Sequence, residues 1–287
     1  MPPRISVVIN TLNEEKNLAF ALRSVHSWVD EIVVVDMHSD DRTVDIAREF
    51  GAKIFFHERV GFADPARAFA LDQASGDWIL VLDADEVVPL PLSRKLLSIA
   101  SSGDADAVLI PWMNYMLGAT MKHSGFGPRQ SLQLRFFKKH CVKATFAIHN
   151  FFHLVPGSRM MALRVEPGLA VAHFAYLDSH QYLEKLNRYT SIEAQQAFER
   201  GERITPVAVL VKAAGEFWSH YVTGRGFQDG WRGFYISLFS TFYQIVAAAK
   251  LQELTVVGRR EAIELRYRQE AEEILKAYGA SQSPSRS

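Results

Sequence analysis

The sequence has almost no cysteine and none of the glycine motifs that bind nucleotides. A single cysteine in 287 residues, Cys141, excludes a disulfide framework and a cysteine-based zinc site. Because neither a GxGxxG turn nor a Walker loop is present, the dinucleotide-binding and P-loop classes lack support. The first residues, MPPRISVV, show no signal-peptide pattern, and we therefore expect a cytoplasmic protein.

Asp and Glu are missing from one long stretch, although the formal net charge of the chain is zero. Residues 107–165 hold eight Lys and Arg and no acid, a balance of +8, whereas residues 1–106 hold 10 Lys and Arg against 18 acids, a balance of −8. This division predicts a half that binds a metal or hydroxyl groups beside a basic surface that meets anionic groups. It disfavours a uniformly basic nucleic-acid face, and chance clustering on a solvated surface is the alternative.

The N-terminal third alternates β-branched apolar runs with helical patterns. Helices are expected after Asn13 as N-cap, over Thr43–Phe50 and over Pro65–Ser75. The order predicts an α/β fold in which a mainly parallel sheet is flanked by helices. Ligands of such sheets bind beyond the carboxyl ends of the strands. The candidate strands are RISVVIN, EIVVVD, AKIFFHE and DWILVLDADE.

The pattern changes after Asp106. AVLIPWMNYML and LQLRFFKK are predicted strands, and the glycine-bearing segment HSGFGPRQS between them is expected to be a mobile loop. A long helix is expected from Ser179 to Arg200, and the rest of the chain is predicted to be helical. Its segment Gly233–Ala249 carries no charge over 17 residues. A buried packing helix, a helix lying on a membrane surface and a membrane span all remain open for it.

Three carboxylates crowd into four positions at the end of the fourth predicted strand. Asp83 and Asp85 lie two residues apart, so their side chains can converge on one Mg²⁺ or Mn²⁺ ion, and Glu86 follows directly. A bound diphosphate would complete the ligands of the ion. The alternative is an exposed loop, because Asp-x-Asp is common in loops.

Polar residues also follow the first two predicted strands. Asp36 ends the second strand and can accept hydrogen bonds from a nucleobase or ribose. Thr11, Asn13 and Glu14 close the first strand at the same edge of the sheet. These strand ends together outline a nucleotide pocket, while helix capping by the acids after Asp36 is the structural alternative.

Several long segments resemble the family-2 glycosyltransferases of GT-A fold, and more closely the subgroup that resembles lipopolysaccharide-core β-glucosyltransferases. The resemblance extends over most of the chain. It implies a GT-A-like nucleotide-diphospho-sugar transferase domain over residues 1–175, with a donor and metal half (1–106) and an acceptor half (107–175). A helical region (176–278) and a tail without fixed structure (279–287) would follow. The segments are SVVINTLNEEKNL, EIVVVDMHSDDRTVDIA, GDWILVLDADE, QLRFFKK, HFAYLDSHQYLEKLNRYT and GRGFQDGWRGF.

The resemblance implies inverting, metal-dependent transfer of a sugar from a nucleotide-sugar to an acceptor hydroxyl. By position, Asp85, Asp83 and His173 would bind Mg²⁺ or Mn²⁺. The donor-binding residues would be Thr11, Asn13, Glu14, Asp36, Arg67 and Asp83.

The chain departs from the family pattern at four positions. His38 and Arg42 stand where the family usually has Gly, and Ser131 and Asn150 stand where members commonly carry an acid. The catalytic base is therefore predicted to be His149, with Glu86 as the competitor.

We expect a hexosyltransferase-like enzyme with a lipid-linked or cell-envelope glycan as acceptor and no nucleic acid as partner. Two rivals remain: a catalytically silent sugar-nucleotide-binding or scaffold protein, and a nucleotidyltransferase. Peripheral contact with the inner face of the membrane is an open alternative to a fully cytoplasmic location. The sequence leaves the oligomeric state, the donor sugar and its nucleobase open.

Overall fold

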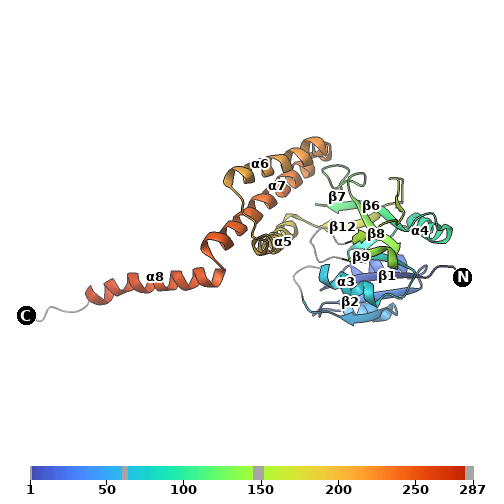
Figure 1. The fold of residues 1–287 in the computed structure, drawn as a ribbon, viewed down its shortest axis with the longest axis horizontal. Coiled ribbons are helices and arrows are strands. Elements are labelled where there is room, and N and C mark those ends of the chain that lie inside the picture. The colour runs from blue at the N-terminus through green and yellow to red at the C-terminus, as the bar shows by residue number, and fades with distance from the viewer. Residues whose placement is uncertain (1, 60–63, 145–151, 282–287) are drawn as a thin grey trace, which may run out of the picture.

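The computed structural model describes residues 2–59, 64–144 and 152–281 (Figure 1). A large sheet occupies the N-terminal part of the molecule, and helices make up the rest. The first part contains β1 (Ile5–Thr11), α1 (Leu18–Val25), β2 (Glu31–Asp36), α2 (Thr43–Glu49), β3 (Lys53–Phe56), α3 (Asp64–Gln73), β4 (Trp78–Asp83), β5 (Glu86–Val87) and α4 (Leu90–Ser102). The second part contains β6 (Ala107–Met116), β7 (Ala119–Thr120), β8 (Leu132–Lys138), β9 (Val142–Ala144), β10 (Phe152–Leu154), β11 (Met160–Ala162) and β12 (Val171–Tyr176).

The main sheet has the strand order β3-β2-β1-β4-β8-β6-β12-β5. Strands β1 to β4 pair in parallel, whereas β8 runs antiparallel to both β4 and β6. The sheet is therefore mixed, and its parallel half coincides with the acidic part of the sequence. The predicted α/β fold class, with a helical C-terminal region, is confirmed.

Helices cover both faces of the sheet because alternate residues of each strand point to opposite sides. Ile5, Val7 and Ile9 of β1 pack in one core with α1 and α4, and Val8 packs in a second core with α3. The core residues Val7, Val8 and Ile9 are at most 1% exposed. Such continuous burial explains the unbroken apolar runs of the sequence.

Two local expectations need correction. The first helix begins at Leu18 and not directly after Asn13, because Asn13 has a φ of 58° and its Oδ1 accepts the N–H of Asp40 at 2.8 Å. Helix α4 was not predicted at all, although Pro91 in its first turn and Gly103 as a left-handed cap mark both of its ends.

The chain leaves the sheet after Tyr176. The C-terminal region contains α5 (Ser179–Glu199), α6 (Pro206–Phe217), the turns η2 (Trp218–Thr223) and η3 (Gly226–Asp229), α7 (Gly230–Gln252), η4 (Glu253–Val257) and α8 (Arg260–Ser281). Helices α6 and α7 pack side by side next to the sheet, and α8 projects away from the rest of the molecule (Figure 1). Helix α8 runs to Ser281, three residues into the expected tail; residues 282–287 lie outside the described part.

Helix α7 contains the charge-free segment and is only partly buried. Its buried side chains are mostly small, such as Ser237, Ser240 and Ala247. Its large aromatic side chains are exposed instead, with Trp231 at 56% and Phe242 at 48%. By length and composition Gly226–Val257 is apolar enough to cross a membrane, but one such helix is weak evidence.

Candidate active site

A cavity of about 1040 Å³, here called the central cavity, lies at the carboxyl ends of β1 and β4. Its walls also include residues of β6, β8, β12 and the helices α5, α6 and α7. Sheet and C-terminal helices thus form one site. Five of the site residues predicted from the sequence line it, namely Glu14, Arg67, Asp83, Asp85 and His173.

Three predicted donor-binding residues connect loops and do not line the cavity. Asp36 is 0% exposed, and its carboxylate accepts hydrogen bonds from Thr11 Oγ1 at 2.9 Å and from Ser39 N at 2.8 Å. Thr11 is 1% exposed. Asn13 binds the loop after β2 through the N–H of Asp40. These contacts hold the ends of β1 and β2 together, and the predicted contact of the three side chains with the nucleoside stays a prediction.

The turn after β2 contains a left-handed residue, His38. His38 stands where Gly is usual, yet it has a φ of 59°, in the left-handed region that favours Gly. Its ring stacks on Phe56 with the centroids 5.4 Å apart.

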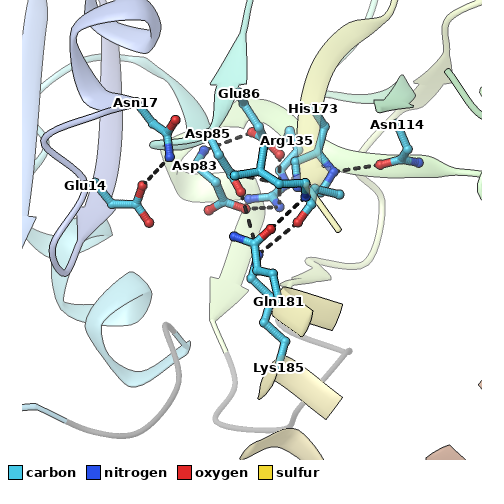
Figure 2. A network of polar contacts seen from close by, with 12 residues as sticks. Glu14, Asn17, Asp83, Asp85, Glu86, Asn114, Arg135, His173, Gln181 and Lys185 are labelled. Carbon is cyan, nitrogen blue, oxygen red and sulfur yellow. Dashed lines mark hydrogen bonds and ion pairs between the residues drawn. The ribbon is translucent and has the colours of Figure 1, made fainter. Parts of the chain in front are cut away.

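Asp83 lies between two arginines, of which Figure 2 labels Arg135. Arg67 contacts its Oδ1, and Arg135 donates to its Oδ2 at 2.9 Å. Burial alone would raise the pKa of the Asp83 carboxyl, but the two guanidinium groups hold it well below its usual range. Both oxygens are thus engaged by cations. Among the described residues, Asp85 lacks such a pair of arginines, and the predicted metal-ligand roles of Asp83 and Asp85 stay predictions.

Glu86 lies beneath this ion pair. Its side chain is 1% exposed, and its Oε2 accepts the backbone N–H of Asp83 at 2.8 Å. Burial, with the charge of Asp83 second, raises the pKa of Glu86 to about 8. Glu86 is not among the described residues that line the central cavity, and its predicted role as the competing base stays a prediction.

Asp85 faces His173 across the cavity wall. Asp85 Oδ1 lies 3.8 Å from His173 Nε2, and the Asp85 carbonyl accepts the N–H of Phe174 at 3.0 Å. On its far side, His173 Nδ1 lies 2.6 Å from Asn114 Oδ1 (Figure 2). Asn114 Nδ2 in turn donates to the Phe126 carbonyl at 2.6 Å, which fixes the amide orientation.

This chain of hydrogen bonds sets the tautomer of His173. Because Asn114 presents an oxygen, the proton of His173 is on Nδ1, and the lone pair of Nε2 points towards the carboxylate of Asp85. Burial, which dominates over the nearby carboxylates, lowers the pKa of His173 and favours the neutral ring. Two electron-pair donors thus face each other, an arrangement that a cation between them would stabilise.

Two positively charged side chains of the site escaped the sequence analysis. Lys185 of α5 places its Nζ 3.9 Å from Asp85 Oδ2, and it donates to the Ala175 carbonyl at 3.1 Å. Arg135 of β8 is the second. The structure packs it over the ring of Trp112, 4.7 Å from the centroid, against Asp83. The block HFAYLDSHQYLEKLNRYT was the available signal for Lys185.

Glu216 and His220 bring a further titratable pair to the central cavity. His220 Nε2 lies 3.0 Å from Glu216 Oε1, and its Nδ1 lies 2.6 Å from the Ser124 carbonyl. The His220 ring also stacks on Phe126 with centroids 5.5 Å apart. No sequence pattern pointed to this pair.

Ser131 and Asn150 are the two positions where the family commonly has an acid. Ser131 accepts the backbone N–H of Trp112 through its carbonyl at 2.8 Å and offers no carboxylate. Asn150 lies outside the described residues. So does His149, and its predicted role as base stays a prediction.

Comparison with known proteins places these features in a family. The sequence profile "Glycosyl transferase family 2" matches residues 6–155. The uncharacterized glycosyltransferase RT0209 of Rickettsia typhi is 27% identical over 266 residues, which cover 89% of each protein. LpsC of Rhizobium meliloti, a lipopolysaccharide core biosynthesis glycosyltransferase, is 23% identical and matches 91% of this chain and 96% of its own.

A solved structure of S. aureus TarS, residues 1–349, aligns with 90% of this chain and 76% of its own, with 13% identity and a TM-score of 0.45. The family profile covers more than half of the chain, including the strand ends that carry Glu14, Asp83 and Asp85. The chain therefore belongs to glycosyltransferase family 2.

Proposed function

We propose that this glycosyltransferase moves a sugar from a nucleotide-diphosphate donor to an acceptor hydroxyl with inversion, and that the donor occupies the central cavity. The single observation that carries the proposal is the convergence of Asp83, Asp85 and His173 with Arg67, Arg135 and Lys185 at one end of the cavity. Carboxylates and cations close together suit a ligand that brings both phosphates and a metal ion.

The three cations would hold the diphosphate. Arg67 and Arg135 are kept in place by Asp83, so their guanidinium groups need no large rearrangement before they meet the donor. Lys185 contacts Asp85 only at 3.9 Å and can turn to a phosphate oxygen. Preorganised positive charge stabilises the nucleoside diphosphate as it leaves the sugar.

Asp85 and His173 fit a divalent metal ion. The observation is the 3.8 Å gap between a carboxylate oxygen and the imidazole Nε2, whose lone pair Asn114 directs towards it. Within the described ranges, no group of three His, Cys, Asp or Glu side chains forms a complete site. Oxygens of the donor would therefore supply further ligands. When bound, Mg²⁺ or Mn²⁺ would neutralise charge on the departing diphosphate.

Glu216 is the best-placed described residue for the base. The described acids that line the central cavity are Glu14, Asp83, Asp85 and Glu216, and only Glu216 comes from the helices after the sheet. His220 holds it in place through the 3.0 Å contact. A carboxylate from α6 would thus replace the acids that residues 107–165 lack, with His149 as the competing candidate.

The acceptor is proposed to be a lipid-linked glycan of the cell envelope, reached from the cytoplasmic face. Helix α6 exposes Val207, Leu210 and Val211, each at 68% or more, and α7 exposes Trp231 and Phe242. Aromatic residues with flanking Arg and Lys suit a bilayer interface, and partial burial of α7 argues against a purely internal packing role. The printed role of LpsC in lipopolysaccharide core biosynthesis supports the same acceptor class.

The test measures donor binding and turnover separately. A panel of nucleotide sugars is screened by thermal shift with and without Mn²⁺, and release of nucleoside diphosphate is then followed with bacterial membranes as acceptor. Asp85→Asn should abolish the Mn²⁺-dependent part of binding and lower turnover by orders of magnitude. Asp104→Asn, an exposed acid outside the cavity, is the matched control.

Each rival predicts a different result. A silent sugar-nucleotide-binding protein would bind a donor without any release of nucleoside diphosphate. A nucleotidyltransferase would release pyrophosphate from a nucleoside triphosphate. Unchanged Mn²⁺-dependent binding in Asp85→Asn would overturn the metal assignment.

A further inference from the structure

A second cavity of about 580 Å³, here called the basic pocket, lies beside the central cavity. Four basic side chains line it, and its other walls come from neutral residues such as Met113 and Tyr115. No Asp or Glu is among the described residues that line it. The four are Lys122, His123, Arg129 and Arg225.

The cations of the basic pocket differ from the other cations of the acid-free stretch. Arg135, Lys138 and Arg159 are each paired with Asp83 or Asp106. In the part of the chain that the structure describes, Lys122, Arg129 and Arg225 form no ion pair with a carboxylate. Like charges that line one cavity repel each other, and an anionic ligand would offset this repulsion.

The start of the motif GRGFQDGWRGF, whose Arg225 the proposed function leaves unused, builds one side of the pocket. Arg225 has a φ of 56° and lies between two glycines that are packed against backbone. A Cβ on Gly224 would lie 2.8 Å from the His220 carbonyl oxygen, and one on Gly226 would lie 2.9 Å from the same atom. Both positions therefore require glycine, and together they present Arg225 in a left-handed conformation.

The loop that carries Lys122, His123 and Arg129 is docked on this motif, which corrects the expectation that it is mobile. Ser124 N donates to the Gly224 carbonyl at 2.8 Å. Asp229 accepts the backbone N–H groups of Lys122 at 3.1 Å and His123 at 3.0 Å. Asp229 thus binds backbone groups of the loop, and the basic side chains stay available to a ligand.

The same loop borders both cavities, since Phe126 lines the central cavity while Arg129 lines the basic pocket. We propose that the basic pocket binds a phosphate group carried by the acceptor and so positions its hydroxyl towards the donor. That the phosphate-bearing ligand is the acceptor rests on the proposed function; the binding of phosphate in the basic pocket does not. Tyr115 and Met113 offer an apolar surface for the sugar ring that bears the phosphate.

The experiment is a titration of the ¹⁵N-labelled full chain with inorganic phosphate, glucose 6-phosphate and, as the neutral control, glucose. Saturable shifts are expected for the amides of 122–130 and 223–226 with both phosphates and not with glucose. Arg225→Gln and Arg129→Gln should each raise the dissociation constant about tenfold, because each removes a charge-assisted hydrogen bond. Arg268→Gln on α8 makes the same charge change outside the pocket and should leave it unaltered.

Phosphate shifts that map to Arg67 and Arg135 instead, or equal dissociation constants in Arg225→Gln and Arg268→Gln, would overturn the proposal. Thermal unfolding of each variant checks that it is folded, and Arg129→Gln on the exposed loop remains informative if Arg225→Gln is unstable. Competition by phosphatidylglycerol vesicles would assign the phosphate to a lipid headgroup, and its absence to a phosphorylated sugar. Nucleotide binding on the same samples reports on the proposed function independently.

Discussion

Replacing Glu86 with Gln tests whether this carboxyl is a base or a buried structural group. Its pKa is raised to about 8 from an ordinary 4.5, by burial first and by Asp83 second. Between these values the folded chain holds one proton more than the unfolded chain, so the stability of the wild type falls as pH rises through this window. Gln has nearly the same shape, can still accept the N–H of Asp83 and carries no proton that must be retained.

The magnitude follows from the pH at which the two chains are compared. At pH 7 the unfolded wild type gains about 3 kcal/mol by releasing the Glu86 proton, a gain that the Gln variant lacks. Glu86→Gln should therefore raise the free energy of unfolding by about 3 kcal/mol at pH 7 and by almost nothing at pH 4. Transfer activity should stay within about tenfold of the wild type, since the side chain does not reach the cavity.

The assay is urea unfolding at both pH values, in buffer with chelator so that no metal bound at Asp85 alters the result. Glu166→Gln, an exposed acid, controls for the loss of one negative charge. A lower free energy of unfolding at pH 7 would refute the account of a protonated, buried Glu86. Loss of turnover with intact donor binding would show instead that Glu86 is the base.

Three further predictions address the metal site, the base and the sheet. Asn114→Leu should weaken Mn²⁺ binding about 10- to 100-fold in the presence of nucleotide, measured by calorimetry, because it frees the imidazole that the amide orients; unchanged affinity would contradict the tautomer assignment. Glu216→Gln should lower the rate of sugar transfer at least 100-fold with donor binding intact, and the control Glu199→Gln on α5 should leave the rate unchanged. If His149→Gln alone lowers the rate, His149 is the base. Burial alone would raise the pKa of the Glu31 carboxyl, but hydrogen bonds from Lys53 Nζ and neighbouring groups lower it to about 2. The contribution of Glu31 to stability is therefore present above pH 4.5 and lost as pH falls through 2. In Glu31→Gln the free energy of unfolding should depend less on pH over that range. The same pH dependence in variant and wild type would contradict this role of Glu31.

The exposed apolar surface of α6 and α7 is proposed to contact the membrane. The full chain should float with vesicles that contain phosphatidylglycerol at low salt, and Leu210→Ser/Val211→Ser should float less, because both side chains are exposed on α6. Protein that stays soluble in both cases would favour a role for this surface in packing against another protein.

Patterns between neighbouring residues determined most of the secondary structure. The apolar run before Asp36 and the one before Asp83 became β2 and β4, and the helical spacing after Ser179 became α5. Alternation, capping and turn formation depend on residues a few positions apart, so one sequence contains the signal. The position of Asp85 just beyond a strand, and hence at the edge of the sheet, could be predicted for the same reason.

Only the tertiary structure decided which of these polar side chains reach the cavity. Asp36 and Glu86 looked as favourable as Asp85 in the sequence, yet packing against Ser39 and Arg135 buries them, because contacts distant in sequence determine exposure. Asn114 and Glu216 carry no local signal of a site, and each joins it from a strand or helix placed there by the fold. The sequence thus determined the elements and the family, whereas the packing of remote elements decided the chemistry of each carboxylate: paired, protonated or free to bind a metal.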